Sequence, residues 1–191
     1  MARTKEFDPD AALQDALELF WERGYAATSM EDLVERLGVA RASLYATFGT
    51  KHELYFKALD RYRESHGPVE RLSQPGPALP AVRELVRDFA AEAAGDRRRR
   101  GCFVLNTAIE LVPADETAAR RVAAAWGEME TALESALRRA RAQGELSADA
   151  DPRSLARFLL VLLQGLKAVG KGAPDAERLR EAAEQALRLL A

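Results

Sequence analysis

The sequence predicts an all-α protein. Apolar residues make up 48% of the 191 residues, and Ala, Leu, Glu and Arg, which favour helices, are abundant. Apolar residues recur along the chain at the i, i+3, i+4 spacing of an amphipathic helix. No Asn-Gly or similar pair separates two alternating stretches, so a hairpin is not indicated. Pro and Gly cluster at 67–68 and 74–77, which predicts two helical domains, residues 6–66 and 67–191.

The N-terminal domain is predicted to contain four helices. Asp8 can cap the first helix, with Pro9 at its first position, and Gly24 ends it. Thr28 or Ser29 can cap the second helix. The expected helices cover about residues 9–23, 30–37, 40–47 and 51–65.

The C-terminal domain is predicted to be a helical bundle. Gly, Pro and Asp residues divide it into helices at about residues 79–94, 101–112, 115–143, 152–171 and 175 onward. The segment FLLVLLQGLKAVG, which begins at Phe158, is apolar almost all round. Such a helix is either buried on several sides or lies at a subunit interface.

The stretch from residue 29 to 48 is predicted to be a helix-turn-helix. Met30, Leu33, Val34 and Leu37 form one apolar face, and Gly38 permits the unusual backbone of a tight turn. In the second helix, the inward side chains are expected to be Leu44 and Phe48.

The outward side of that second helix is suited to DNA. Small residues such as Ala42 allow a close approach to the major groove, and Arg41 can bond guanine or phosphate. Ser43, Tyr45 and Lys51 can bond phosphate oxygens. An ordinary pair of packed helices would show the same periodicity, however. Residues 1–66 also hold 9 Lys and Arg against 12 Asp and Glu, a net charge of 9 − 12 = −3, whereas DNA-binding heads are usually basic.

The order and spacing of a dozen positions resemble the signature of the TetR (tetracycline-repressor-like) family. The positions are Thr28-Ser29, Leu33-Val34, Leu37-Gly38-Val39, Ser43-Leu44-Tyr45, Phe48, Lys51 and Leu54. The resemblance covers about residues 6–66 and implies a three-helix DNA-binding head with a helix-turn-helix, followed by a helix that connects it to the C-terminal bundle. It further implies a C-terminal bundle that binds a small-molecule effector and forms a homodimer. Many members carry an aromatic or His pair at Ala46-Thr47, so the operator sequence stays open.

Site residues follow from the motif and from this resemblance. The expected DNA contacts are Arg3, Lys5, Thr28, Ser29, Arg41, Ala42, Ser43, Tyr45 and Lys51. The expected interface, on the last two helices, comprises Leu159, Leu162, Leu163, Leu166, Val169, Leu179, Ala183 and Leu187. The function implied is a repressor that binds a palindromic operator as a dimer and is released by a small molecule.

The effector pocket is expected around the 101–112 helix. Asn106 and Glu110 share a face there and could hold a polar group, although Glu110 could equally be exposed or paired with an arginine. Cys102 follows four arginines and could sense electrophiles, but a buried, inert thiol is commoner. The candidate ligand-binding residues are Cys102, Phe103, Asn106, Glu110, Trp126, Met129 and Phe158.

Other classes of function have little support. His52 and His66 are the only histidines, and no metal-ligand spacing, phosphate loop or nucleophile–base pair is present, so no enzyme, metal or cofactor is expected. A single Cys and a polar N-terminus indicate the cytoplasm, and the longest apolar run is too short for a membrane span. A helical adaptor that does not bind DNA remains the alternative from another class.

Overall fold

The computed structural model describes residues 7–67 and 69–190, apart from the side chain of His66. These residues form ten helices joined by turns and loops, and they contain no strand, so the all-α prediction is confirmed. The chain divides into two compact units, Met1–His66 and Gly67–Ala191. Arg3 and Lys5, expected at DNA, lie outside the described residues.

The first unit is a small helical domain with an aromatic core. Its helices are α1 (Pro9–Arg23), α2 (Met30–Leu37), α3 (Arg41–Phe48) and α4 (Lys51–His66). Asp8 caps α1 by accepting the N–H of Asp10 at 2.9 Å. In the core, the rings of Phe20 and Tyr55 pack edge to face with centroids 5.0 Å apart. Because α1 packs on α4 and α2, and α3 on α2 and α4, this core fixes α3 in place.

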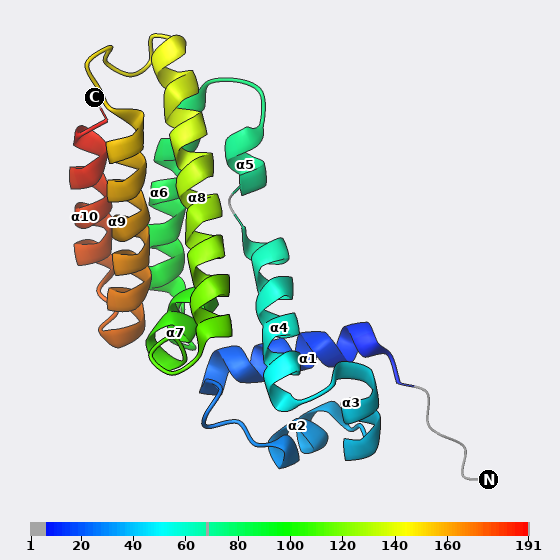
Figure 1. Ribbon diagram of the computed structural model, residues 1–191. Coiled ribbons are helices and arrows are strands. Elements are labelled where there is room, and N and C mark those ends of the chain that lie inside the picture. Colours follow the sequence, from blue (N-terminus) through cyan, green and yellow to red (C-terminus); the bar gives the residue numbers. More distant parts are fainter. Residues whose placement is uncertain (1–6, 68, 191) are drawn as a thin grey trace. The chain divides into compact units, whose positions relative to one another are not determined.

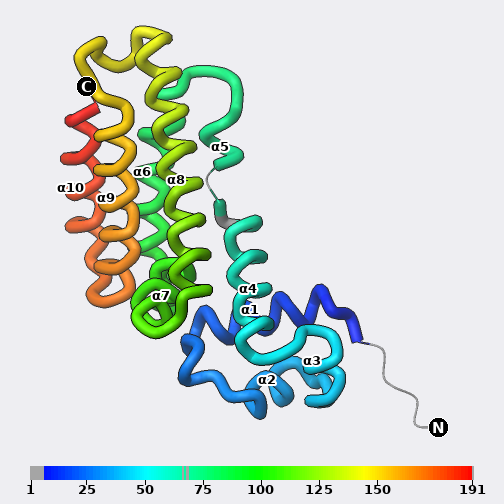
Figure 2. Tube along the Cα trace, in the orientation of Figure 1, coloured from blue at the N-terminus to red at the C-terminus, as the bar shows by residue number. Residues whose placement is uncertain are grey.

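The second unit is a bundle built from four long helices. Its helices are α5 (Val69–Ser73), α6 (Ala78–Gly95), α7 (Phe103–Glu110), α8 (Glu116–Ala142), α9 (Pro152–Gly172) and α10 (Ala176–Arg188). Helices α6, α8, α9 and α10 lie side by side, and short α7 packs at the end where α8 begins (Figures 1 and 2). The short α5 was not predicted, because Pro68 and the Gln74–Pro77 segment leave only five residues for it.

Aspartates set the starts of three body helices, as their positions predict. Asp115, Asp151 and Asp175 each accept a backbone N–H in the first turn of α8, α9 and α10. The 101–112 helix is shorter than expected, because Gly101 has a positive φ of 66° and the helical turns begin only after Cys102. Within the described residues, no helix combines the length and the apolar composition that a membrane crossing requires.

Candidate nucleic-acid interface

A capping box and a glycine turn shape the helix-turn-helix. The Ser29 hydroxyl accepts the N–H of Asp32 at 3.0 Å, and the Asp32 carboxylate accepts the N–H of Ser29 at 2.8 Å. Gly38 then ends α2 in the left-handed conformation, with φ 64° and ψ 21°. A side chain would strain that backbone, so the turn into α3 depends on glycine.

Helix α3 buries one face and exposes the other. Leu44 and Phe48 are 1% and 5% exposed and anchor the helix in the head. The opposite side exposes Arg41, Ala42 and Tyr45. Ser43 is half-buried, and no side chain caps the start of the helix. The arrangement is a helix with one cation, small residues and a phenol on its outer surface, which suits a major groove.

Arg41 has partners on both helices of the motif. Its Nη1 donates to Oε1 of Glu31, in α2, at 2.7 Å, and its Cζ lies 5.8 Å from the centre of the Tyr45 ring. Hydrogen bonding with Tyr45, and next the charge of Glu31, raise the pKa of Arg41 above its ordinary value. Both side chains of the ion pair are largely exposed. The sequence alone did not single out Glu31, whose acidic charge counted only against DNA binding.

Thr28 does not fit the role expected for it. Its side chain is 0% exposed, and its hydroxyl donates to the backbone carbonyl of Gly24 at 2.7 Å. The expectation that this side chain anchors a phosphate is therefore wrong: Thr28 closes the loop before α2. The two residues of the Thr28-Ser29 pair therefore have different roles. Ser29, unlike Thr28, caps the helix, and its hydroxyl stays at the surface.

Lys51 is held within the head. Its ammonium donates to the backbone carbonyls of Tyr25 and Thr28, at 2.9 and 2.7 Å, and lies 4.1 Å from the centre of the Tyr25 ring. Two of its three N–H groups are used in this way. The contacts assign Lys51 a role in fixing the loop between α1 and α2.

The predicted ligand-binding residues are only partly brought together. Cys102 is 8% exposed just before α7, and Phe103 is fully buried. Both polar atoms of Asn106 are engaged: Nδ2 donates to the carbonyl of Arg100 and Oδ1 accepts from Lys171, each at 2.9 Å. Glu110 is half-buried at the end of α7. The start of α7 is therefore a packed junction that leaves little access to the thiol.

Nε1 of Trp126, in α8, and Oε1 of Gln164, in α9, are among the buried side-chain atoms of the body that lack a hydrogen-bond partner. Met129, one turn from Trp126, packs partly buried against the apolar core. Gln164 was missed, although a signal existed: it is the only polar side chain in the apolar stretch FLLVLLQGL. Phe158 is 39% exposed, and its assignment as a pocket wall stays a prediction.

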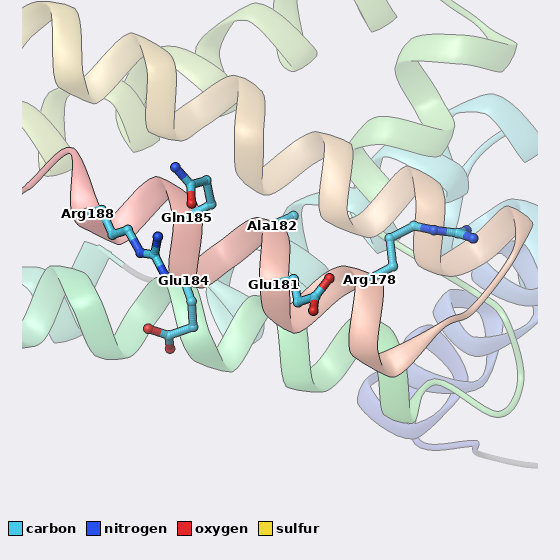
Figure 3. Close-up of a pocket in the computed structure, with 6 residues that line it drawn as sticks. All are labelled: Arg178, Glu181, Ala182, Glu184, Gln185 and Arg188. Atoms are coloured by element: carbon cyan, nitrogen blue, oxygen red, sulfur yellow. The ribbon is translucent and has the colours of Figure 1, made fainter.

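An open groove of about 500 Å³ runs along the outer surface of α10. All its lining residues belong to that helix: Arg178, Glu181, Ala182, Glu184, Gln185 and Arg188 (Figure 3). Glu184 points toward α6 and accepts from Nε of Arg87 at 2.7 Å. None of the predicted ligand-binding residues lines this groove.

The expected dimer residues need correction. Six of the eight are at most 5% exposed in the core of a single chain: Leu159, Leu163, Leu166, Leu179, Ala183 and Leu187. Their side of α9 and α10 packs on the neighbouring helices of the bundle. The exposed side of α9 carries Phe158, Val161 and Val169 instead, at 39%, 72% and 41%. A helix that is apolar all round does not reveal in sequence which face the bundle covers.

Comparisons with known proteins agree with this architecture. The family model described as "Bacterial regulatory proteins, tetR family" matches residues 12–58. The one described as "Tetracyclin repressor-like, C-terminal domain" matches residues 78–187. The chain is 37% identical over 193 residues to the uncharacterized HTH-type transcriptional regulator YezE of Bacillus subtilis (strain 168), covering 100% of both chains. It is 33% identical to the HTH-type transcriptional repressor ComR of Escherichia coli (strain K12), covering 98% of this chain and 90% of ComR.

Solved structures give the same result. A cysteine mutant of the TetR family transcriptional regulator CifR, complexed with a 26-bp double-strand operator DNA, is similar with a TM-score of 0.88. The two sequences are 35% identical, and the match covers 100% of each chain. Family models match both units, and full-length relatives share more than 30% identity. The chain belongs to the TetR family of helix-turn-helix transcription regulators.

Proposed function

We propose that this regulator binds a near-palindromic operator as a homodimer and that a small molecule bound in its C-terminal unit releases it. The observation that carries the proposal is the outer side of α3, where Arg41, Ala42 and Tyr45 are exposed on a helix anchored by Leu44 and Phe48. The two copies of α3 would enter successive major grooves, about one helical turn apart or somewhat more. The family is one of DNA-binding regulators rather than enzymes, which supports a location with the chromosome in the cytoplasm.

The outer surface of α9 and α10 supports the dimer. Along α9, the exposed residues Phe158, Val161, Gly165, Ala168 and Val169 form an apolar stripe with small residues at its centre. Small residues let a second helix approach closely, and burial of this stripe would stabilise association. The groove lies on the outer surface of α10 and would receive side chains of the second copy (Figure 3).

The contact between α8 and α9 supports the effector site. Arg157 in α9 donates to Glu130 in α8 at 3.0 Å, so these two residues lie opposite each other on the neighbouring helices. Trp126 lies one turn before Glu130, and Gln164 lies two turns after Arg157. Since α8 and α9 run antiparallel, Trp126 and Gln164 lie on the same side of the Glu130–Arg157 ion pair. Along the helix axes they are about one helical turn apart.

The two unpartnered atoms indicate the chemistry of the effector. A buried donor or acceptor without a partner costs about 1–3 kcal/mol, which a ligand can recover by completing the bond. The Trp126 indole N–H needs an acceptor, and Oε1 of Gln164 needs a donor. A hydroxyl group supplies both, and the adjacent charges of Glu130 and Arg157 already pair with each other. We therefore propose a neutral, largely apolar effector that carries a hydroxyl or an amide.

The proposal is tested with the full-length protein and duplexes selected from a random library. Footprinting should protect two half-sites related by two-fold symmetry, and sedimentation should give two protein chains per duplex. Equal affinity for selected and random duplexes at physiological salt, or one chain per duplex, would contradict it.

A further inference from the structure

We propose that Glu31 is a positioning residue for DNA recognition: it holds the guanidinium of Arg41 in the orientation that sets the base preference of α3. The inference rests on the proposed contact of Arg41 with bases. It goes further in giving a role to an acidic residue on the DNA-facing motif of a head whose net charge is −3, from 9 Lys and Arg and 12 Asp and Glu in residues 1–66.

The geometry holds the guanidinium from two sides. Glu31 is the second residue of α2, and Arg41 is the first residue of α3. The Glu31 carboxylate accepts from Nη1 of Arg41 at 2.7 Å, and the ring of Tyr45 lies one turn further along α3, 5.8 Å from Cζ. An unrestrained arginine would sample many rotamers at the surface. The two contacts restrict it before DNA arrives.

The remaining donors stay available for DNA. A guanidinium carries five N–H donors in a planar fork, and only those that face Glu31 and Tyr45 are engaged. The other donors can reach O6 and N7 of a guanine, which is the commonest specific contact of arginine. Since the fork is already oriented, less rotamer freedom is lost on binding. A base other than the preferred one does not align its acceptors with these donors.

The ion pair contributes more to orientation than to folding. The side chains of Arg41 and Glu31 are 55% and 73% exposed, and exposed pairs of this kind stabilise a fold very little. Arg41 is also the only cationic residue of α3. Any base preference that a cation gives to this helix therefore depends on Arg41 alone. The orientation of the Arg41 guanidinium depends in turn on Glu31.

Glu35 offers a matched control. It lies one turn after Glu31 on α2 and is exposed, so Glu35→Ala removes the same charge from the same helix while leaving the Arg41 pair intact. The experiment compares Glu31→Ala, Glu31→Gln and Glu35→Ala as full-length proteins. Each is bound to duplexes from a random library and then titrated with single-base variants of the selected operator. Thermal melts confirm that each variant is folded at the binding temperature.

Glu31→Ala should flatten the preference at the base pair that Arg41 contacts. A bidentate arginine–guanine contact discriminates by about five- to a hundredfold. We expect the ratio of affinities for the preferred and the substituted base pair to fall at least about threefold in Glu31→Ala. Glu35→Ala should leave this ratio unchanged. Glu31→Gln should keep most of the preference, because its amide oxygen can still accept from Nη1.

A double-mutant cycle separates the two proposals. If Arg41→Ala leaves the base preference intact, the proposed contact of Arg41 fails. If Arg41→Ala flattens the preference but Glu31→Ala matches Glu35→Ala, the contact stands and the positioning role is wrong. A uniform gain of affinity for all sequences with Glu31→Ala, beyond that of Glu35→Ala, would show that Glu31 competes with DNA for Arg41 and would also overturn the proposal. In an Arg41→Ala background, removing Glu31 should have no further effect on preference.

Discussion

Oε2 of Glu145 accepts the backbone N–H of Leu79 at 2.8 Å, so a residue from the loop after α8 caps the start of α6. The same oxygen accepts the N–H of Ala78 at 2.9 Å, while Pro77, at the cap position itself, provides no side-chain bond. A carboxylate at a helix N-terminus also interacts favourably with the helix dipole. The contact joins two segments of the body that are far apart in sequence.

Glu145→Ala should therefore lower the free energy of unfolding by about 1–2 kcal/mol, as the loss of an N-cap does. Asp149→Ala is the matched control: it removes a carboxylate from the same loop, at a position exposed to solvent. Urea denaturation followed by circular dichroism measures both. Equal midpoints for the two variants would contradict a capping role for Glu145.

Lys51→Met should destabilise the head by about 1–2 kcal/mol, because it leaves the carbonyls of Tyr25 and Thr28 without a charged donor. Operator affinity should fall as the head loosens, but its dependence on salt should stay the same. A lysine that contacts a phosphate changes the slope of log K against log salt by about 0.9. Titrations at several salt concentrations distinguish the two roles, and a slope reduced by that amount would restore the phosphate contact expected from the sequence.

Val161→Glu should convert the dimer to a monomer without unfolding the chain. Val161 is 72% exposed on α9, so a charge there costs the monomer little but would be buried without a partner in the proposed interface. Ile109→Glu is the control, since Ile109 is 69% exposed on α7, outside that surface. Sedimentation equilibrium gives the oligomeric state. A Val161→Glu protein that remains dimeric would exclude the outer face of α9 as the interface.

Acid should weaken the head partly through Asp32. Hydrogen bonds from the hydroxyl and backbone of Ser29, and then the charge of Arg23, hold the pKa of Asp32 below its ordinary value of 3.8. A lowered pKa adds stability above pH 3.8 that disappears as the pH falls through the folded-state value. The wild type should therefore be more stable than Asp32→Asn at pH 7, and the gap should narrow below about pH 4.

Tryptophan fluorescence can follow the head alone in this experiment. Trp21 lies in α1 and Trp126 in α8, so a Trp126→Phe background leaves Trp21 as the reporter of the head. A stability gap between wild type and Asp32→Asn that stays constant from pH 7 to pH 3 would show that the carboxylate does not act through its charge.

The sequence was most informative where a local rule decides the structure. Asp8 and Gly38 mark helix ends through bonds within a few residues, as predicted, and of the two candidate caps Thr28 and Ser29 it is Ser29 that caps α2. The helix-turn-helix was predicted from these capping and turn residues and from its family signature. Contacts between distant segments left no such mark: Lys51 bonding the carbonyl of Thr28, across 23 residues, could not be foreseen. On α9, the run of apolar residues hid which face the bundle covers, so Leu159 was assigned to the interface and Val161 was not.

Two glutamine-to-leucine substitutions should differ in their effect on stability. Gln164 has a buried Oε1 without a partner, whereas Gln143 bonds the carbonyl of Gly76 and the N–H of Ala78, both at 3.1 Å. Gln164→Leu removes an unsatisfied group and adds apolar contact, so the free energy of unfolding should rise or stay level, with a gain of up to about 1–2 kcal/mol. Gln143→Leu should lower it by about 1 kcal/mol, because two hydrogen bonds are lost at the start of α6.

The same pair of variants bears on the effector. If the unpartnered oxygen of Gln164 is kept for a ligand, Gln164→Leu should bind the operator normally and lose its response to the effector, while Gln143→Leu should still respond. Operator release is measured by fluorescence anisotropy of a labelled duplex, with hydroxyl- and amide-bearing apolar compounds set against hydrocarbons of the same skeleton. A Gln164→Leu protein that is less stable than wild type by more than about 1 kcal/mol would mean that the amide has a structural partner, such as a bound water. In that case Gln164 would no longer support the proposed site between α8 and α9.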